Sequence, residues 1–134
     1  MGKRDPTLIK HIMVEGVVTC RPEDSLLDVI TLLDDAEISA LVVVDAKGIA
    51  LGVISHVDLI GYYDRDLEAA RAEDILSPDI VSLEPAAPVQ EAVDLMLEER
   101  IHRVFVLDAE GRPVGVLSTT DIIHDMRGSD ELSV

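Results

Sequence analysis

The chain repeats itself at a fixed interval, and this repeat constrains the fold more than any other feature of the sequence. Displacing the sequence by 63 positions aligns residues 12–60 with residues 75–123 without a gap, and fourteen aligned positions are identical. Many of the remaining pairs exchange one aliphatic residue for another. A repeat of this length is typical of one supersecondary unit used twice. Because each unit alone has too little core, we expect the two units to bury their apolar faces against each other.

Within each unit the pattern predicts the order strand–helix–strand–strand–helix. A short extended segment ends at Pro22 and again at Pro85. Apolar residues then recur at helical spacing from Leu26 and from Val89, after Asp24 as the expected N-cap and after a first-turn proline at position 88. Two strands joined by a hairpin follow in each unit, with Gly48 and Gly111 supplying the positive φ of the DAKG and DAEG turns. Further helical stretches begin at about residues 56 and 119.

These signals divide the chain into four segments. We expect a first repeat at residues 8–63, a helical connector at 64–74, a second repeat at 75–126 and a flexible tail at 127–134. The first dozen residues are expected to form a lead-in segment that packs on the pair of repeats.

Composition excludes several classes of function. The formal charge of −16 argues against nucleic acid and against an anionic membrane as partners, since both require a basic face. No stretch approaches the ~20 apolar residues that cross a bilayer, and the start lacks the apolar core of a signal peptide. Cys20 is the only cysteine, so neither an intrachain disulfide nor a cysteine-based metal site is possible. We therefore expect a cytoplasmic protein.

No catalytic or metal constellation is evident in the sequence. The four histidines are scattered without helical metal spacing, so we expect no metal site. We find no activated nucleophile and no cofactor loop, so we do not expect an enzyme or a required cofactor.

The phrase GVISHVDLI at residues 52–60 returns as GVLSTTDII at residues 115–123, each with Ser and Asp three residues apart. One interpretation is a ligand site: the glycine permits close backbone approach, the hydroxyl and helix-start N–H groups suit a phosphate, and the carboxylate suits ribose hydroxyls. The other interpretation is a helix cap, because Ser-x-x-Asp is close to a capping box. Duplication would copy either equally well.

The chain resembles a tandem pair of CBS (cystathionine-beta-synthase) domains over nearly all of residues 8–126. The residues that carry the resemblance are ILSPDIVSLEPAAPVQEAVDLMLEERIHRVFVLDAEGRPVGVLSTTDII and their first-half counterpart. The resemblance implies an α+β fold of the α/β type, with two β-α-β-β-α repeats packed around a pseudo-twofold axis. It also implies two clefts for adenine nucleotides or related adenosyl compounds, a regulatory role, and a homodimer in the form of a disc.

The resemblance also assigns site residues, and in each cleft it combines residues of both repeats. The first cleft would contain Val53, Ser55, Asp58, Ile80, Ser82, Ile101, His102 and Arg103. The second would contain Val116, Ser118, Asp121, Val17, Thr19, Ile38 and Ser39.

The first cleft has two potential cations, since the His-Arg pair suits phosphates, and the second has almost none. We therefore expect a phosphorylated adenosine in the first cleft, and a less charged ligand or none in the second. The acidity of the chain favours AMP or ADP over ATP, and S-adenosylmethionine is a further candidate.

Two functions from different classes remain open. The first is a sensor in which an adenosyl ligand alters the pair and a partner protein, not identified by the sequence, reads the change. The second is a ligand-free assembly module in which the Ser-x-x-Asp phrases are only helix caps.

Overall fold

The computed structural model describes the backbone of residues 5–132 and the side chains of residues 5–128. Its internal contacts divide the chain into two compact units. Within the described residues, unit 1 comprises 5–16, 81–109 and 114–132, and unit 2 comprises 17–80 and 110–113. Unit 2 therefore holds most of the first repeat, and unit 1 holds most of the second.

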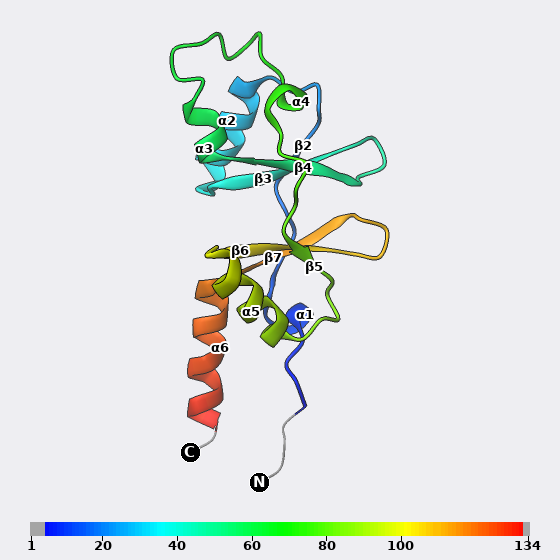
Figure 1. Cartoon of the computed structure of the whole chain (residues 1–134), viewed down its shortest axis with the longest axis vertical. Helices are drawn as coiled ribbons and strands as arrows, with labels where there is room; N and C mark the ends of the chain where they lie inside the picture. The colour runs from blue at the N-terminus through cyan, green and yellow to red at the C-terminus, as the bar shows by residue number, and fades with distance from the viewer. Residues whose placement is uncertain (1–4, 133–134) are drawn as a thin grey trace. The chain divides into compact units, whose positions relative to one another are not determined.

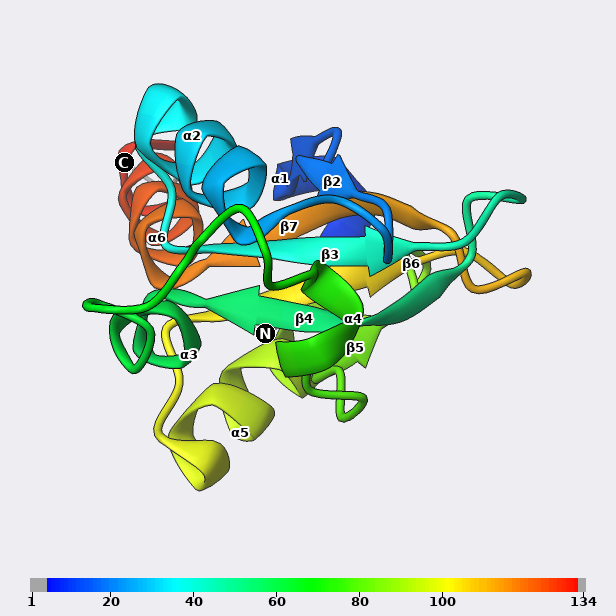
Figure 2. The same cartoon turned by 90° about the horizontal axis from the view of Figure 1, so that it is seen from above.

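Unit 2 is a three-stranded sheet with helices on one face (Figures 1 and 2). Its elements are β2 (Thr19–Cys20), α2 (Leu26–Ala36), β3 (Ala40–Val44), β4 (Ala50–Ser55), α3 (His56–Ile60) and α4 (Ala72–Ile75). The strand order is β2-β3-β4, with β2 parallel to β3 and β3 antiparallel to β4. Figure 2 shows β3 and β4 side by side.

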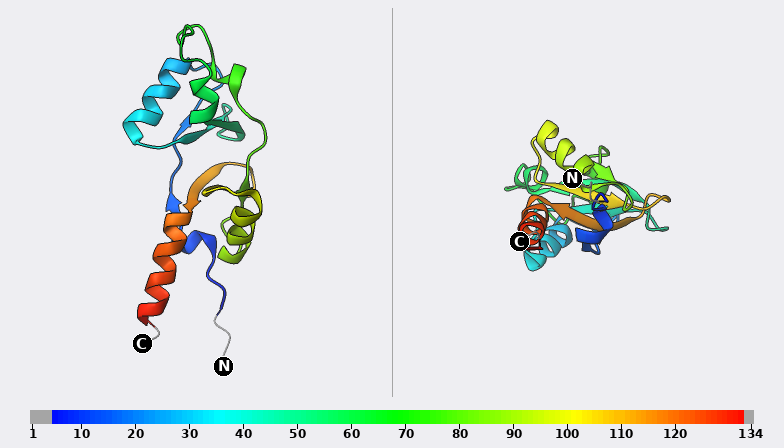
Figure 3. Two further views of the ribbon diagram at one scale, coloured as in Figure 1. Left: turned by 60° about the vertical axis from the view of Figure 1, so that its left-hand side comes forward. Right: turned by 90° about the horizontal axis from the view of Figure 1, so that it is seen from below.

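Unit 1 repeats this plan with one additional strand (Figures 1 and 3). Its elements are α1 (Ile9–Ile12), β1 (Val14–Glu15), β5 (Ser82–Leu83), α5 (Val89–Glu99), β6 (Arg103–Leu107), β7 (Pro113–Ser118) and α6 (Thr119–Leu132). The strand order is β1-β7-β6-β5. The predicted order strand–helix–strand–strand–helix is thus confirmed in both repeats, as is the mixed α and β fold.

Each unit has its own aliphatic core between its sheet and its helices. Apolar residues on one face of α2 and of α5 are buried because they recur every three or four positions, the spacing of a helix face. In unit 2 the buried cluster is Cys20, Leu26, Val29, Leu33, Leu41, Val43, Ile54, Leu59 and Ala72. In unit 1 it is Ile9, Ala87, Val89, Ala92, Met96, Val104, Val106 and Leu117. Burial of a Leu, Ile or Val side chain stabilises a fold by about 1.5–3 kcal/mol, so these clusters hold each unit together.

The two units exchange their lead-in segments. Helix α1 lies at the start of the first repeat but belongs to unit 1, where Ile9 is fully buried and α1 contacts α6 (Figure 3). Helix α4 lies 63 residues later and belongs to unit 2. The strand pairing repeats in the same way, since Val14 pairs with Val116 and Ser77 pairs with Val53. Each unit is therefore completed by the segment at the N-terminal end of the other repeat.

Both hairpin turns have the predicted geometry. Gly48 has φ +81° and Gly111 has φ +84°, a conformation that favours glycine. The carboxylate of Asp45 accepts hydrogen bonds from the N–H groups of Lys47 and Ile49 at 2.8 and 3.0 Å. The bond from Ile49 N–H is the main cause of the lowered pKa of Asp45. The local sequence thus determines the turn.

The cap of α2 differs from the prediction by one residue. Ser25 is the N-cap, and its Oγ accepts a hydrogen bond from Asp28 N–H at 3.1 Å. Asp24 instead accepts from Arg21 N–H at 2.8 Å, within the turn that precedes the helix. The carboxylate therefore organises the approach to the helix and the hydroxyl caps it. Pro88 is the N-cap of α5, one position before the predicted first turn.

The connector is less helical than predicted. Residues 61–71 form turns, and the only helix in the segment is α4. The carbonyl groups of Leu67 and Ala70 accept hydrogen bonds from Leu27 N–H and Leu26 N–H in the first turn of α2. Because these carbonyls are used by α2, they do not continue a helix of their own.

The end of the chain also differs from the prediction. Helix α6 runs on through residues 127–132, where a tail is expected, and residues 133–134 lie outside the described residues. None of the described helices is long and apolar enough to span a membrane.

Candidate functional site

The first Ser-x-x-Asp phrase folds at the junction of β4 and α3 in unit 2. Ser55 is the last residue of β4 and the N-cap of α3, and Asp58 is the third residue of that helix. Asp58 Oδ2 accepts hydrogen bonds from Ser55 N at 2.9 Å and from Ser55 Oγ at 3.1 Å. Both side chains are half-buried. The carboxylate is thus held in a fixed orientation by the residue that ends the strand.

The second phrase adopts the same geometry in unit 1. Asp121 Oδ2 accepts from Ser118 N at 2.8 Å and from Ser118 Oγ at 2.9 Å. Asp121 N in turn donates to Ser118 Oγ at 3.3 Å. This reciprocal pattern is a capping box with Asp in place of the more common Glu. The cap interpretation of the phrase is therefore correct as a description of the fold.

The cap uses only one of the two carboxylate oxygens of each aspartate. The hydrogen bonds that the side chains of Asp58 and Asp121 accept all go to Oδ2, and Oδ1 of each accepts no hydrogen bond from the described residues. An ionised carboxylate has about four acceptor sites on its two oxygens. Each phrase therefore presents a pre-oriented acceptor that the fold leaves available.

The expected anion site at the helix start is largely filled by the protein itself. In unit 2, Ser55 N–H donates to Asp58, and His56 N–H donates to the carbonyl of Ser39 at 2.9 Å. In unit 1, Ser118 N–H and Asp121 N–H are engaged within the cap, and Thr119 N–H donates to the carbonyl of His102 at 2.9 Å. A carboxylate also occupies the position that an anion would take at these helix starts. Recognition of a phosphate would consequently fall to side chains.

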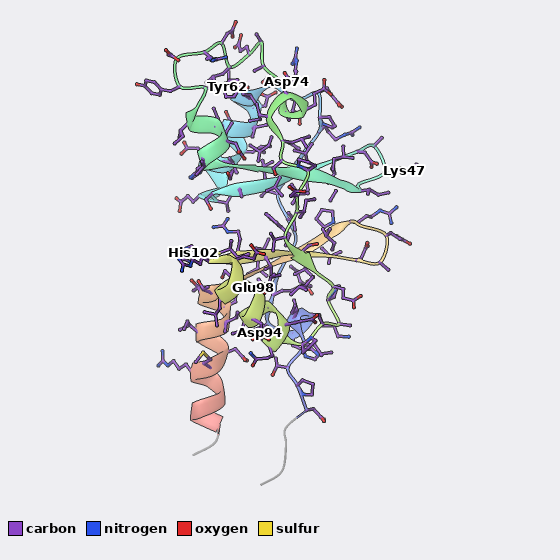
Figure 4. All side chains as sticks on the ribbon, in the orientation of Figure 1. Lys47, Tyr62, Asp74, Asp94, Glu98 and His102 are labelled. Atoms are coloured by element: carbon purple, nitrogen blue, oxygen red, sulfur yellow. The ribbon has the colours of Figure 1, made fainter. Side chains whose placement is uncertain are left out.

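The same backbone bonds bring a second predicted position beside each phrase. Ser39 lies next to the Ser55–Asp58 phrase, and His102 lies next to the Ser118–Asp121 phrase, each one residue before a strand. His102 is exposed, and Figure 4 shows it at the start of β6. Arg103, the first residue of β6, is half-buried. In each unit the fold thus places the aspartate of the phrase near the residue that precedes the central strand.

The sheets place other predicted residues on one face. In unit 2, Thr19 pairs with Val42 and Val42 pairs with Val53, so the three form a row across the sheet. Their sequence neighbours Cys20, Leu41, Val43 and Ile54 belong to the core under the helices. Because successive strand residues point to opposite faces, the row lies on the face away from those helices. Ser82 and its partner Phe105 form the equivalent row in unit 1.

The remaining predicted residues are divided between the units. Val17, Ile38 and Ile80 belong to unit 2, and Ile101 and Val116 belong to unit 1. All five are half-buried. The two predicted clefts each combine residues of both units, so these combinations stay predictions.

Two residues central to these rows were missed at the sequence level. Val42 is fully buried and Phe105 is 6% exposed, and neither belongs to the core cluster of its own unit. Sequence reasoning missed these two residues because β3 and β6 are apolar on both faces. A continuous apolar run does not reveal which face of the sheet a residue lies on. Among the described residues, no group of three or more His, Cys, Asp or Glu side chains could hold a metal ion.

The sequence model of the CBS domain matches residues 9–65 and again residues 72–128. The chain belongs to the CBS domain family. An inosine-5′-monophosphate dehydrogenase of Methanocaldococcus jannaschii is 28% identical to this CBS pair over 113 residues, which cover 84% of the pair and 22% of that relative. The pair thus spans about a fifth of that enzyme. The 5′-AMP-activated protein kinase subunit gamma of Saccharomyces cerevisiae is 27% identical over 121 residues, covering 84% of the pair and 38% of the subunit.

Solved structures share the fold of this CBS pair. One is a CBS domain pair in complex with 5′-methylthioadenosine and S-adenosyl-L-methionine, with a TM-score of 0.80 and 24% identity over 93% of this chain and 99% of the other. Another is CBSX2 in complex with AMP, a protein from Arabidopsis thaliana, with a TM-score of 0.82 and 21% identity over 92% and 98% of the two chains. At these identities the likeness establishes the fold alone.

Proposed function

We propose that this CBS pair is a regulatory module that binds an adenosine-containing ligand and relays its occupancy to a protein partner. The observation that carries the proposal is the duplicated Ser–Asp arrangement, in which Oδ2 is held by the serine and Oδ1 stays available. A ribose hydroxyl can donate to Oδ1 of Asp58 or Asp121 without breaking the cap. The complexes of related CBS pairs with AMP and with adenosyl compounds support this ligand class.

The side chains at the start of β6 favour a phosphorylated ligand. Arg103 offers a planar guanidinium that suits bidentate contact with phosphate oxygens, and exposed His102 precedes it. The helix starts are occupied by carboxylates, so the phosphate depends on these two residues. A net charge of −16 opposes a highly anionic ligand, which favours AMP or ADP over ATP.

The half-buried side chains on the helix-free sheet faces, Thr19, Val53 and Ser82, suit an adenine ring, whereas Val42 and Phe105 are buried. The row formed by Thr19, Val42 and Val53 combines two aliphatic side chains with one hydroxyl. Ser82 beside Phe105 offers the same combination with an aromatic ring. Ligand sites are typically apolar surfaces with few polar groups, and these rows have that composition.

The decisive experiment is a calorimetric titration of the wild type with AMP, ADP, ATP, NAD and S-adenosylmethionine. Asp58→Ala and Asp121→Ala are titrated in parallel, and thermal unfolding of each variant measures the loss of its cap, about 1 kcal/mol. We expect heat from AMP or ADP that disappears in Asp58→Ala and persists in Asp121→Ala. Silence from every ligand at millimolar concentration would overturn the proposal.

The second candidate is a ligand-free assembly module. The observation that favours it is the complete reciprocal cap at Ser118 and Asp121, which accounts for the phrase without any ligand. In that case both alanine variants lose stability and no adenosyl compound binds. The same titration therefore separates the two functions.

The proposal includes a homodimer and a cytoplasmic location. Unit 1 exposes Ile123 and Met126 at 63% and 60%, three residues apart on one face of α6. Exposed apolar side chains that gather in one region are typical of an interface. Neither nucleic acid nor a membrane is proposed as a partner, and neither catalysis nor a required cofactor is part of the proposal.

A further inference from the structure

We propose that a pocket in unit 2, separate from the Ser–Asp arrangements, binds a small organic cation with an apolar body. The pocket has a volume of about 420 Å³, within the range of about 300–1,000 Å³ of small-molecule sites. It lies between α2, α3 and the turns that follow α3. Ile30, Leu33, Leu59 and Leu67 supply its apolar lining.

The polar groups of the pocket favour a positive charge. Asp34 is among the residues that line it, together with His56, Tyr62 and Tyr63. None of the residues that line the pocket is lysine or arginine. An acidic group beside two aromatic rings attracts an organic cation by charge and by cation–π contact.

A cation of the protein already lies over one aromatic ring of the pocket, so an organic cation relies on Asp34 and on the ring of Tyr63. The guanidinium carbon of Arg65 lies 5.5 Å from the centroid of the Tyr62 ring, within the range of a cation–π contact. Tyr62 belongs to the turn after α3, and Figure 4 labels it there. Tyr63 is 92% exposed, so its ring can close on a ligand without unpacking the core.

The pocket is not a duplicated feature of the fold. The positions equivalent to Asp34, His56, Tyr62 and Tyr63 lie 63 residues later and are Leu97, Thr119, Asp125 and Met126. The helices that follow the two Ser–Asp phrases also differ in length. In unit 1 helix α6 runs from Thr119 to Leu132, whereas in unit 2 helix α3 ends at Ile60 and turns follow it. The combination of Asp, His and two Tyr residues is thus present in the first repeat alone.

The pocket also lies on a different side of α3 from the Ser–Asp arrangement. His56, Leu59 and Ile60 are spaced three and four residues apart and share one face of the helix. Asp58 is two residues from both His56 and Ile60 and does not line the pocket. The pocket can therefore be tested independently of nucleotide binding.

The test uses phenethylammonium and its neutral near-isostere 2-phenylethanol. Each is titrated at pH 8 into the full chain while the methyl resonances of Leu33, Leu59 and Leu67 are followed by NMR. We expect shifts at these residues and a Kd for the amine at least about fivefold lower than that for the alcohol.

Asp34→Asn should abolish this preference, and Asp35→Asn is the matched control. Asp35 is the adjacent exposed carboxylate on α2, and it does not line the pocket. Tyr63→Ala should weaken the binding of the amine more than that of the alcohol. Equal binding of the two compounds, equal effects of the two asparagine variants, or no shift at millimolar amine would each overturn the proposal.

Discussion

Gly52 packs against the carbonyl oxygen of Ser77 so closely that a Cβ atom at position 52 would lie 2.4 Å from that oxygen. The same carbonyl accepts a hydrogen bond from Val53 N–H at 2.8 Å, and Ser77 N–H donates to Val53 O at 2.9 Å. The glycine of the repeated phrase thus allows the backbone at Ser77 to pack closely against β4. The close backbone approach that the sequence indicates is an approach of the chain to itself.

Replacement of Gly52 should therefore destabilise the protein. Gly52→Ala should lower the free energy of unfolding by about 1–3 kcal/mol, because backbone atoms rather than a flexible side chain must yield. Urea unfolding followed by circular dichroism measures the change.

Gly61→Ala is the matched control. Its nearest neighbour would be Asp58 O at 3.8 Å, and its φ of −64° suits any residue. We expect no loss, and a gain of up to about 1 kcal/mol from the smaller entropy of the unfolded chain. Equal destabilisation by both substitutions would contradict the packing argument.

Arg103 should recognise the phosphate of the ligand. Arg103→Ala is expected to weaken AMP about tenfold, because charge-assisted hydrogen bonds are lost, and to leave adenosine unchanged. Arg100→Asn removes a nearby positive charge and is the control, since asparagine tolerates the left-handed φ of 55° at that position. Calorimetry with both ligands measures the effect, and equal losses in the two variants would point to general electrostatics.

The partner of Arg103 in the ligand site can be identified by double-mutant cycles. Arg103→Ala is combined with Asp58→Asn in one cycle and with Asp121→Asn in the other, because these milder substitutions leave the binding of AMP measurable. The predicted first cleft requires coupling with Asp58 in the affinity for AMP. Coupling with Asp121 alone would instead place the arginine in the other cleft.

The exposed apolar residues of unit 1 should hold the proposed dimer together. Light scattering after size exclusion is expected to give twice the 14.6 kDa of the chain for the wild type. Ile123→Glu with Met126→Glu should give the monomer mass, because two charges would be buried in the interface. Leu51→Glu, at a residue 40% exposed on β4, is the control and should stay dimeric. A dimer that survives the double substitution would exclude this surface.

Cys20 should make stability depend on alkaline pH. Burial, aided by Asp24 and Glu23, raises the pKa of its thiol from 9.0 to about 12. The unfolded chain then loses its thiol proton at a lower pH than the folded chain, so the thiol's contribution to stability falls between pH 9 and 12. The loss should be about 1 kcal/mol between pH 9 and pH 10.

The comparison with Cys20→Ala isolates this effect from other titrating groups. The difference in free energy of unfolding between the two proteins should change across that interval, and iodoacetamide should modify the native thiol far more slowly than the unfolded one. Rapid native alkylation at pH 8 would contradict the burial of the thiol.

Several features followed from local sequence because local interactions decide them. The hairpins at Gly48 and Gly111 need only a positive φ and an aspartate that accepts nearby N–H groups. Helices α2 and α5 follow from a repeating apolar face. The Ser–Asp caps form between residues three positions apart. The connector shows the limit of this reasoning. Its composition favours a helix, but residues 61–71 form turns because the carbonyl groups of Leu67 and Ala70 accept hydrogen bonds from α2.

By itself the sequence determined the repeat, the order of elements in each unit and the residues of the duplicated phrase, because each depends on spacing along the chain. Only the tertiary structure decided which segment completes which unit, since the pairing of Val14 with Val116 joins positions about a hundred residues apart. It also decided that most of the helix-start donors are occupied and that β3 and β6 present Val42 and Phe105 away from the helices. These outcomes depend on which backbone groups and sheet faces come into contact in the folded chain. The pattern of apolar residues along the sequence does not specify those contacts.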